Sequence, residues 1–216
     1  RDFCLSRGLG DVYKRQDVVC GFSTITEYME QRQNFGSTVG RYIGRILNAR
    51  FTLDGVEYKL VPNNGKSGHI SHGGNPGFAD RIWKVEQADT HRVRLSYLSP
   101  DGENGFPGNL KVTLVYSLGE DDNALDLTYE ATTDAPTVLN LSHHSFFNIS
   151  GNFTKSVEDQ QLWVDADRFT PYDDKKCVTG EYLPVAGTPL DFRMPHAIGA
   201  VSYTHLRAHE TGRNLV

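Results

Sequence analysis

The sequence contains few cysteines and no long apolar segment. Only three of its 216 residues are cysteines. Two of them, Cys20 and Cys177, lie in the central part of the chain, too far apart for the usual spacing of metal ligands, and they do not require a disulfide. No window approaches the roughly 18 consecutive apolar residues of a membrane-spanning helix. We therefore expect a protein with reduced thiols, no metal and no membrane segment, located in the cytoplasm.

The charge balance also excludes one class of partner. The net charge is −5, and no basic run occurs outside the two ends of the chain. Proteins that bind nucleic acid usually carry a basic patch, so we expect no nucleic-acid partner. With 38% hydrophobic and 23% charged residues, the composition is that of a globular domain with an ordinary core.

The two ends of the chain are related to each other at the level of DNA. A DNA sequence that encodes Ser6 to Gln16 encodes, on its opposite strand, Val201 to Glu210 and the first base of the Thr211 codon. We therefore expect residues 1–16 and 201–216 to be translated from a tag used in sequencing libraries, and residues 17–200 to be part of a natural domain. Segments of this origin are left out of reasoning about the fold.

The central part has the pattern of a β-protein. Apolar and polar residues alternate with the period of a half-buried strand in several segments, and Asp54-Gly55 is a strong signal for a tight hairpin turn. One short helix is expected over Thr24–Gln33, with Thr24 or Thr26 as its cap. This pattern predicts an all-β sandwich or barrel. The predicted strands lie in 51–60 (two strands), 92–99, 110–118, 124–132 and 161–165, with Asp121-Asp122-Asn123 as a hairpin loop.

Leu139 to Gly151, with the sequence LNLSHHSFFNISG, is the most informative stretch of the chain. His143 and His144 are adjacent within an alternating run. Neighbouring side chains on a strand point to opposite faces, so one imidazole can face a cleft while the other faces the protein. A histidine in a cleft can donate or accept a proton near neutral pH.

Several motifs together resemble one family, the aldose 1-epimerases, also called galactose mutarotases. Besides the HHSFFN segment, the chain contains FGSTVGRYIGRI from Phe35, HGG from His72 followed by Gly77-Phe78 and Trp83, SPDGENGFPGNL from Ser99, and GTPLDFR from Gly187. These blocks follow the order of the family. The resemblance implies the large antiparallel β-sandwich of the galactose mutarotase-like fold, here expected to be incomplete at the C-terminus.

The resemblance also implies an enzyme of the isomerase class, which interconverts the α and β anomers of free hexoses such as galactose and glucose. His144 would be the catalytic general acid, and His72 and Arg45 would bind the monosaccharide; no cofactor or metal is implied. The family's general base is a glutamate near the C-terminus. No glutamate in residues 17–200 lies in a matching motif, so we expect this chain to be inactive or nearly so.

Other residues near these motifs are expected to have structural roles. We expect His143 to support the site, His69 to be a solvated loop residue, Arg41 to form a structural pair and Asp191 to follow a turn. Gly44 departs from the family pattern, in which asparagine is frequent. Some aromatic side chains could stack on a sugar, although most should be in the core: Phe78, Trp83, Phe106, Phe146 and Phe147.

Three alternative readings stay open. A hexose-phosphate epimerase would need a basic phosphate clamp, which is not evident in the sequence. A non-catalytic carbohydrate-binding β-sandwich module would bind a sugar without exchanging its anomers. A zinc site would have to be built from histidines alone, because no carboxylate or cysteine has the required spacing; its candidates are His69, His72, His143 and His144.

Overall fold

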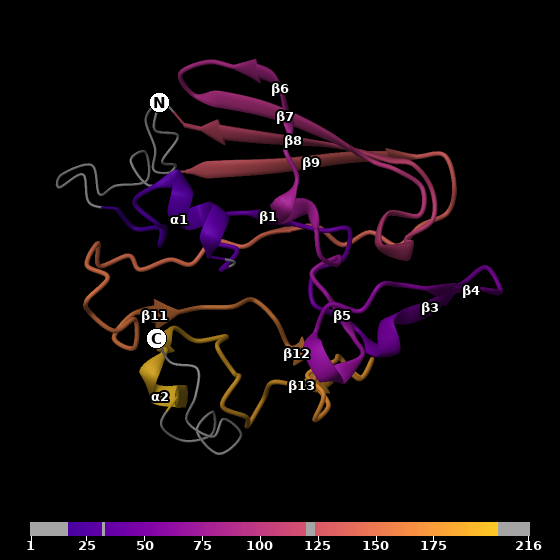
Figure 1. Ribbon diagram of the computed structural model, residues 1–216. Helices are drawn as coiled ribbons and strands as arrows, with labels where there is room; N and C mark the ends of the chain where they lie inside the picture. The colour runs from indigo at the N-terminus through magenta and orange to yellow at the C-terminus, as the bar shows by residue number, and fades with distance from the viewer. Residues whose placement is uncertain (1–16, 32, 120–123, 203–216) are drawn as a thin grey trace. The chain divides into compact units, whose positions relative to one another are not determined.

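The computed structural model in Figure 1 describes residues 17–31, 33–119 and 124–202 of the chain. The two predicted tag segments therefore lie outside the described residues, except for positions 201 and 202, and so does the predicted hairpin loop at Asp121-Asp122-Asn123. The chain divides into two compact units, residues 1–147 and 148–216. No helix in the described part of the chain is both long enough and apolar enough to cross a bilayer.

Strands dominate the first unit. The predicted helix is present, but it is shorter than expected, and Thr24 caps it through a reciprocal pair of bonds with Glu27. The elements of this unit are α1 (Ile25–Glu30), β1 (Thr38–Val39), β2 (Arg45–Ile46), β3 (Arg50–Leu53), β4 (Val56–Lys59), β5 (Ile70–Ser71), β6 (Lys84–Ala88), β7 (Arg92–Ser99), β8 (Leu110–Leu118), β9 (Leu125–Thr133) and β10 (Ser142–His143).

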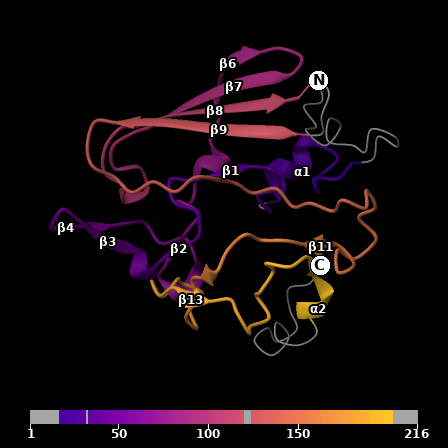
Figure 2. The same ribbon diagram turned by 180° about the vertical axis from the view of Figure 1, so that it is seen from behind.

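The largest described sheet has four antiparallel strands in the order β6-β7-β8-β9, which lie side by side in Figures 1 and 2. β7 and β8 begin and end where the alternation predicts, and β9 is displaced by one residue. Leu110, Val112 and Leu114 of β8 are almost fully buried, whereas Lys111 between them is exposed. Burial of alternate apolar side chains is what holds a sheet of this kind together.

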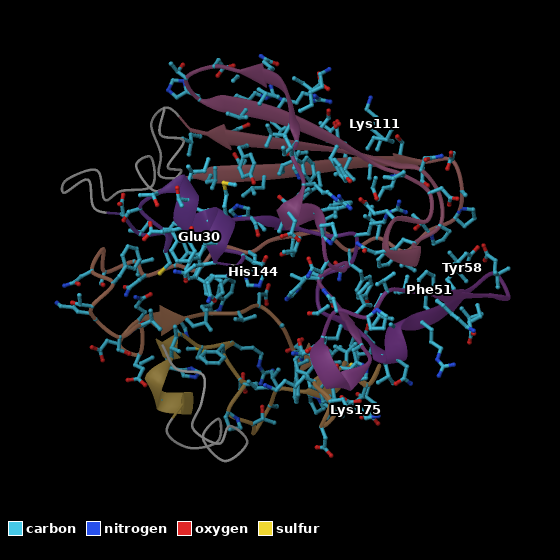
Figure 3. All side chains as sticks on the ribbon, in the orientation of Figure 1. Glu30, Phe51, Tyr58, Lys111, His144 and Lys175 are labelled. Atoms are coloured by element: carbon cyan, nitrogen blue, oxygen red, sulfur yellow. The ribbon has the colours of Figure 1, made fainter. Side chains whose placement is uncertain are left out.

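The predicted hairpin is also confirmed. β3 and β4 are joined by Asp54 and Gly55, which both have positive φ angles, of 50° and 79°. Such angles match the tight turn that connects strands with a right-handed twist. Phe51 and Tyr58 face each other across the pair, with ring centroids 5.3 Å apart, and both are labelled in Figure 3.

The stretch around the two histidines forms a much shorter strand than its alternation suggests. Only Ser142 and His143 are in β10, which pairs with β1 so that His143 lies opposite Thr38. The flanking residues change partners, because Asn140 bridges to Tyr42 and Phe147 bridges to Val19. The segment is thus extended along its length, but no single neighbouring strand accompanies it.

The second unit contains pairs of two-residue strands: β11 with β14 and β12 with β13. The strand predicted at 161–165 is therefore shorter than expected. Asp191 forms an ion pair with Arg193, with 2.8 Å between Oδ2 and Nη2, which is consistent with the structural role predicted for it. The elements of this unit are β11 (Gln161–Leu162), β12 (Arg168–Phe169), β13 (Leu183–Pro184), β14 (His196–Ala197) and α2 (Gly199–Ser202).

Candidate functional site

Arg45 is held in place by a short pair of strands. In the pairing of β2 with β5, Arg45 lies opposite Ser71, and Ile46 lies opposite Ile70. Ile70 is buried in a core cluster, which fixes the strand pair to the interior. Because His72 directly follows Ser71, this register places the two predicted sugar-binding residues next to each other.

The backbone of Gly44 holds His72 from two sides. The Gly44 N–H donates to Nδ1 of His72 at 3.2 Å, and the His72 N–H donates to the Gly44 carbonyl at 2.9 Å. Since Nδ1 accepts a hydrogen bond, the neutral ring carries its proton on Nε2, which can then donate to a ligand. Burial lowers the pKa of His72, and the nearby His144 and Arg45 act in the same direction. The asparagine frequent at position 44 in the family would also tolerate the positive φ of 82° found there.

The turn after His72 requires glycine. Gly73 has a φ of 82°, and a Cβ at this position would overlap the backbone carbonyl of Gly40. Asn104 closes the turn, because its side-chain amide donates to the carbonyls of Gly73 and Pro76, each at 2.9 Å. Gly73 therefore allows close packing of two backbone segments, and Gly74 leaves room for the side chain of Asn104.

His144 and His143 point to different neighbours. The His144 ring, labelled in Figure 3, lies edge-on to His72 with 5.3 Å between the ring centroids, and 5.0 Å from the ring of Phe146. His143 instead contacts Tyr116 of the four-stranded sheet at 5.6 Å, and its Nδ1 is 2.8 Å from Oγ of Ser145. Burial lowers the pKa of His143. The alternation rule thus predicts the orientation of the two imidazoles correctly.

A polar cavity of about 330 Å³ lies beside Arg45 and His72. Its wall offers a guanidinium, an imidazole and several carboxamides, which are groups that bind hydroxyls. His144 is not among the lining residues, but its ring adjoins that of His72. The three predicted site residues are therefore close to one cavity. The other lining residues are Asn34, Val39, Asn63, Asn64, Ser71, Gly74, Asn75, Gly77, Ala79 and Asp80.

The cavity wall includes residues that the motifs do not identify. The side chain of Asn63 forms two hydrogen bonds with the backbone of Ser71, at 2.7 and 2.9 Å, and so ties the 63–70 loop to β5. Asn64 also lines the cavity. The sequence marks these residues only by their place in the connection of 27 positions from Arg45 to His72.

The prediction that His69 is solvated is wrong. His69 is 1% exposed, and its Nδ1 accepts a hydrogen bond from the Asn48 N–H at 2.9 Å. Asn48 lies in the tight turn Leu47–Ala49 with a positive φ of 53°, and the buried ring of His69 provides the acceptor for its N–H.

The aromatic residues divide between core and surface. Phe78 and Phe106 are buried as expected, and Trp83 is half-buried. Trp83 packs against the buried cluster of Phe78, so three of the five residues are in or against the core, as expected of most of them, whereas Phe146 and Phe147 are exposed. Phe146 contacts the rings of Phe35 and His144, and these contacts leave much of its surface open.

The four histidines considered for zinc do not form a metal site. Among the residues that the structure describes, no group of three or more His, Cys, Asp or Glu side chains is placed to hold a metal ion. His69 and His143 are instead used as described above, in contacts with Asn48 and with Tyr116 and Ser145.

The fold is the galactose mutarotase-like fold, as comparison with solved structures shows. The GalM/aldose epimerase homologue from C. elegans matches 90% of this chain with a TM-score of 0.82 and 34% identity, over 58% of its own length. Galactose 1-epimerase from Lactobacillus acidophilus NCFM matches 88% of this chain with a TM-score of 0.76 and 30% identity, over 56% of its own length.

Sequence comparison shows the family. The family model described as Aldose 1-epimerase matches residues 10–215, and the chain belongs to this family. The galactose mutarotase of Sus scrofa is 40% identical over 186 residues, which are 86% of this chain and 53% of that protein. The aldose 1-epimerase of Escherichia coli (strain K12) is 35% identical over 185 residues, 86% of this chain and 52% of that protein. The chain thus spans about half the length of these relatives.

Proposed function

We propose that the site binds a free hexose, galactose or glucose, and interconverts its α and β anomers in the protein to which residues 17–200 belong. The observation that carries this proposal is the meeting of Arg45, His72 and His144 beside one polar cavity. The names of the relatives, galactose mutarotase and aldose 1-epimerase, support it.

In this mechanism His144 is the general acid. It gives a proton to the ring oxygen of the pyranose while the C1 hydroxyl loses one, so that the ring opens to an aldehyde. Rotation about the bond to C1 and closure of the ring on the other face then yield the other anomer, and His144 takes its proton back. An acid placed in this way contributes about 10²–10⁴-fold to the rate.

His72 and Arg45 orient the sugar. The neutral His72 ring donates from Nε2 to a hydroxyl oxygen, because Gly44 occupies Nδ1. Arg45 offers the rigid fork of a guanidinium to neighbouring hydroxyls. The C1 proton must also be accepted by a base. No glutamate in residues 17–200 lies in a segment that matches the family's glutamate motif, so the chain of 216 residues should bind the sugar with little anomer exchange.

Polarimetry of freshly dissolved α-galactose tests the proposal. The experiment compares the chain of 216 residues with a longer protein, which contains residues 17–200 and the natural residues encoded after them. We expect fast exchange only in the longer protein, reduced about 10²–10⁴-fold by His144→Ala. The exposed His91, changed to alanine, is the matched control and should leave the rate unchanged.

Two results of this assay would contradict the proposal. An unchanged rate of anomer exchange in the His144→Ala variant would show that His144 is not the general acid. Sugar binding without any exchange in the longer protein would favour a carbohydrate-binding module, and exchange of a hexose phosphate in preference to galactose would favour the phosphorylated substrate.

The same proposal includes a cytoplasmic location. No disulfide joins Cys20 to Cys177, as a reducing compartment allows. Cell fractionation with an antibody against residues 17–200 tests this, and recovery in a secreted fraction would contradict it.

A further inference from the structure

Arg41 is the largest fully buried side chain among the described residues, with 1% of its surface exposed. Its guanidinium donates at 2.8–3.3 Å to acceptors that are all uncharged. A planar fork of five N–H groups can satisfy so many acceptors at once, and a lysine cannot. The acceptors are Oγ and O of Ser99, the carbonyls of Pro100, Pro107 and Gly108, and Oγ1 of Thr137.

A carboxylate lies one side chain further away from this buried charge and interacts with it favourably. Ser99, which accepts from Nε of Arg41, donates in turn to Glu103. Glu103 also accepts from Tyr97 Oη at 2.7 Å and forms an ion pair with Arg81 at 2.6 Å. The network therefore fixes Arg41 to the connection between β7 and β8. Loss of one partner in such a buried network is costly.

The backbone around Arg41 meets the segments that carry the site. The Arg41 carbonyl accepts from the N–H of Asn140 at 2.9 Å, four residues before His144. The carbonyl of Gly40 lies against Gly73, the neighbour of His72, so closely that Gly73 has no room for a Cβ. Arg45 lies four residues after Arg41 in the same segment. One buried side chain thus anchors the point where the three segments converge.

We propose that Arg41 is a positioning residue, which holds the 40–45 segment so that His72 and Arg45 line one cavity and His144 lies against His72. The role assigned to the three site residues is that of the proposed function above, and Arg41 acts through them without touching the sugar. The same anchor sets the distance between the two imidazoles, because Gly40 packs against the turn of His72 and Arg41 bonds the strand that leads to His144.

The test measures the ring pKa of His72 by NMR in the full chain of 216 residues. In Arg41→Lys and Arg41→Met the pKa should rise toward its ordinary value of about 6.5, because a loosened cavity wall admits water. Leu114→Ala is the control: it removes a buried side chain of β8 and lowers the melting temperature, and it should leave the pKa of His72 unchanged. A purely structural role of Arg41 would make all of these variants alike.

A milder variant keeps the test decisive if the Arg41 variants do not fold. Ser99→Ala removes one acceptor of Arg41 and its link to Glu103, and it should cause a smaller rise in the same pKa. An unchanged pKa in the folded Arg41 variants, or in Ser99→Ala where those do not fold, overturns the proposal.

Galactose binding measured in parallel separates this inference from the proposed function. We expect Arg41→Lys to weaken binding about tenfold, which corresponds to about 1.4 kcal/mol. If the unmodified chain does not bind galactose, the proposed function fails, while the pKa comparison still decides whether Arg41 positions His72.

Discussion

The four-stranded sheet β6–β9 and the segments around the cavity are stabilised in different ways. In the sheet, several buried apolar side chains such as Val112 and Leu114 lie along continuous, fully paired strands. Around the cavity the paired strands have only two residues each, and single polar groups or glycines hold them. The comparison teaches that the site depends on a few individual residues, each of which makes contacts that no neighbour duplicates.

The largest effect is expected at Gly73. Replacement by alanine combines a positive φ of 82° with overlap of the new Cβ and the Gly40 backbone, so we expect a loss of at least about 4 kcal/mol in the free energy of unfolding. Chemical denaturation measures this loss. Gly102 has a similar φ of 76° with open space around it, so Gly102→Ala should cost only about 1–2 kcal/mol. Equal losses at the two glycines would contradict the close packing described here.

A change in the sheet should have the next largest effect. Leu114→Ala should cost about 2–5 kcal/mol, because it leaves a cavity in a buried row, whereas the exposed Leu98 on the neighbouring strand should tolerate alanine within about 0.5 kcal/mol. Thermal and urea unfolding would check both values. A large loss at Leu98 would show that the outer face of the sheet is covered.

His69 tests the polar side of the comparison. His69→Ala leaves the Asn48 N–H without its acceptor and should cost about 1–3 kcal/mol. His91→Ala, at an exposed position, is the control and should change the stability by less than about 0.5 kcal/mol. If the two variants were equally stable, His69 would not support the turn.

The smallest effect is a dependence of stability on pH that differs between the two regions. At the cavity, the lowered pKa of His72 means that the unfolded chain takes up a proton at a higher pH than the folded chain. The contribution of His72 to stability is therefore complete above about pH 6.5 and is lost as the pH falls through its folded-state pKa. In the sheet, burial raises the pKa of Tyr116 to about 12, so its contribution is complete below about pH 10 and is lost as the pH rises through 12.

NMR signals of the two regions, followed during acid and alkaline titrations, check this difference. Acid should affect the signals around the cavity first, and alkali those of β8. Loss of the β8 signals first in acid would contradict the assignment of the buried groups. His72→Gln should reduce the acid sensitivity, and His91→Gln should not.

The sequence predicts the elements whose determinants are local. The alternation in β7 and β8, the Asp54-Gly55 turn and the Thr24 cap each depend on residues a few positions apart, and the structure contains all of them. The convergence of Arg45, His72 and His144 was predicted from the family resemblance, since no local pattern relates residues so far apart in the chain.

The remaining features depend on contacts between distant parts of the chain. Arg41 was expected to have a structural role, but its partners at Ser99 and beyond are 58 or more residues away and leave no periodic signal. The buried ring of His69 bonds to the turn at Asn48, which lies 21 residues earlier, and no local pattern relates the two residues. The short length of β10 follows from its change of partners, which alternation alone cannot reveal.

The most direct measurement is a titration of the 216-residue chain with galactose, in which NMR follows the ring signals of the histidines. We expect the signals of His72 and His144 to shift together with one dissociation constant, and those of His69 and His91 not to respond. In Arg45→Met, both ring signals should report the same weakening of galactose binding. Ring signals of His72 and His144 that stay unchanged at saturating galactose, or that report two separate constants, would contradict a shared sugar site.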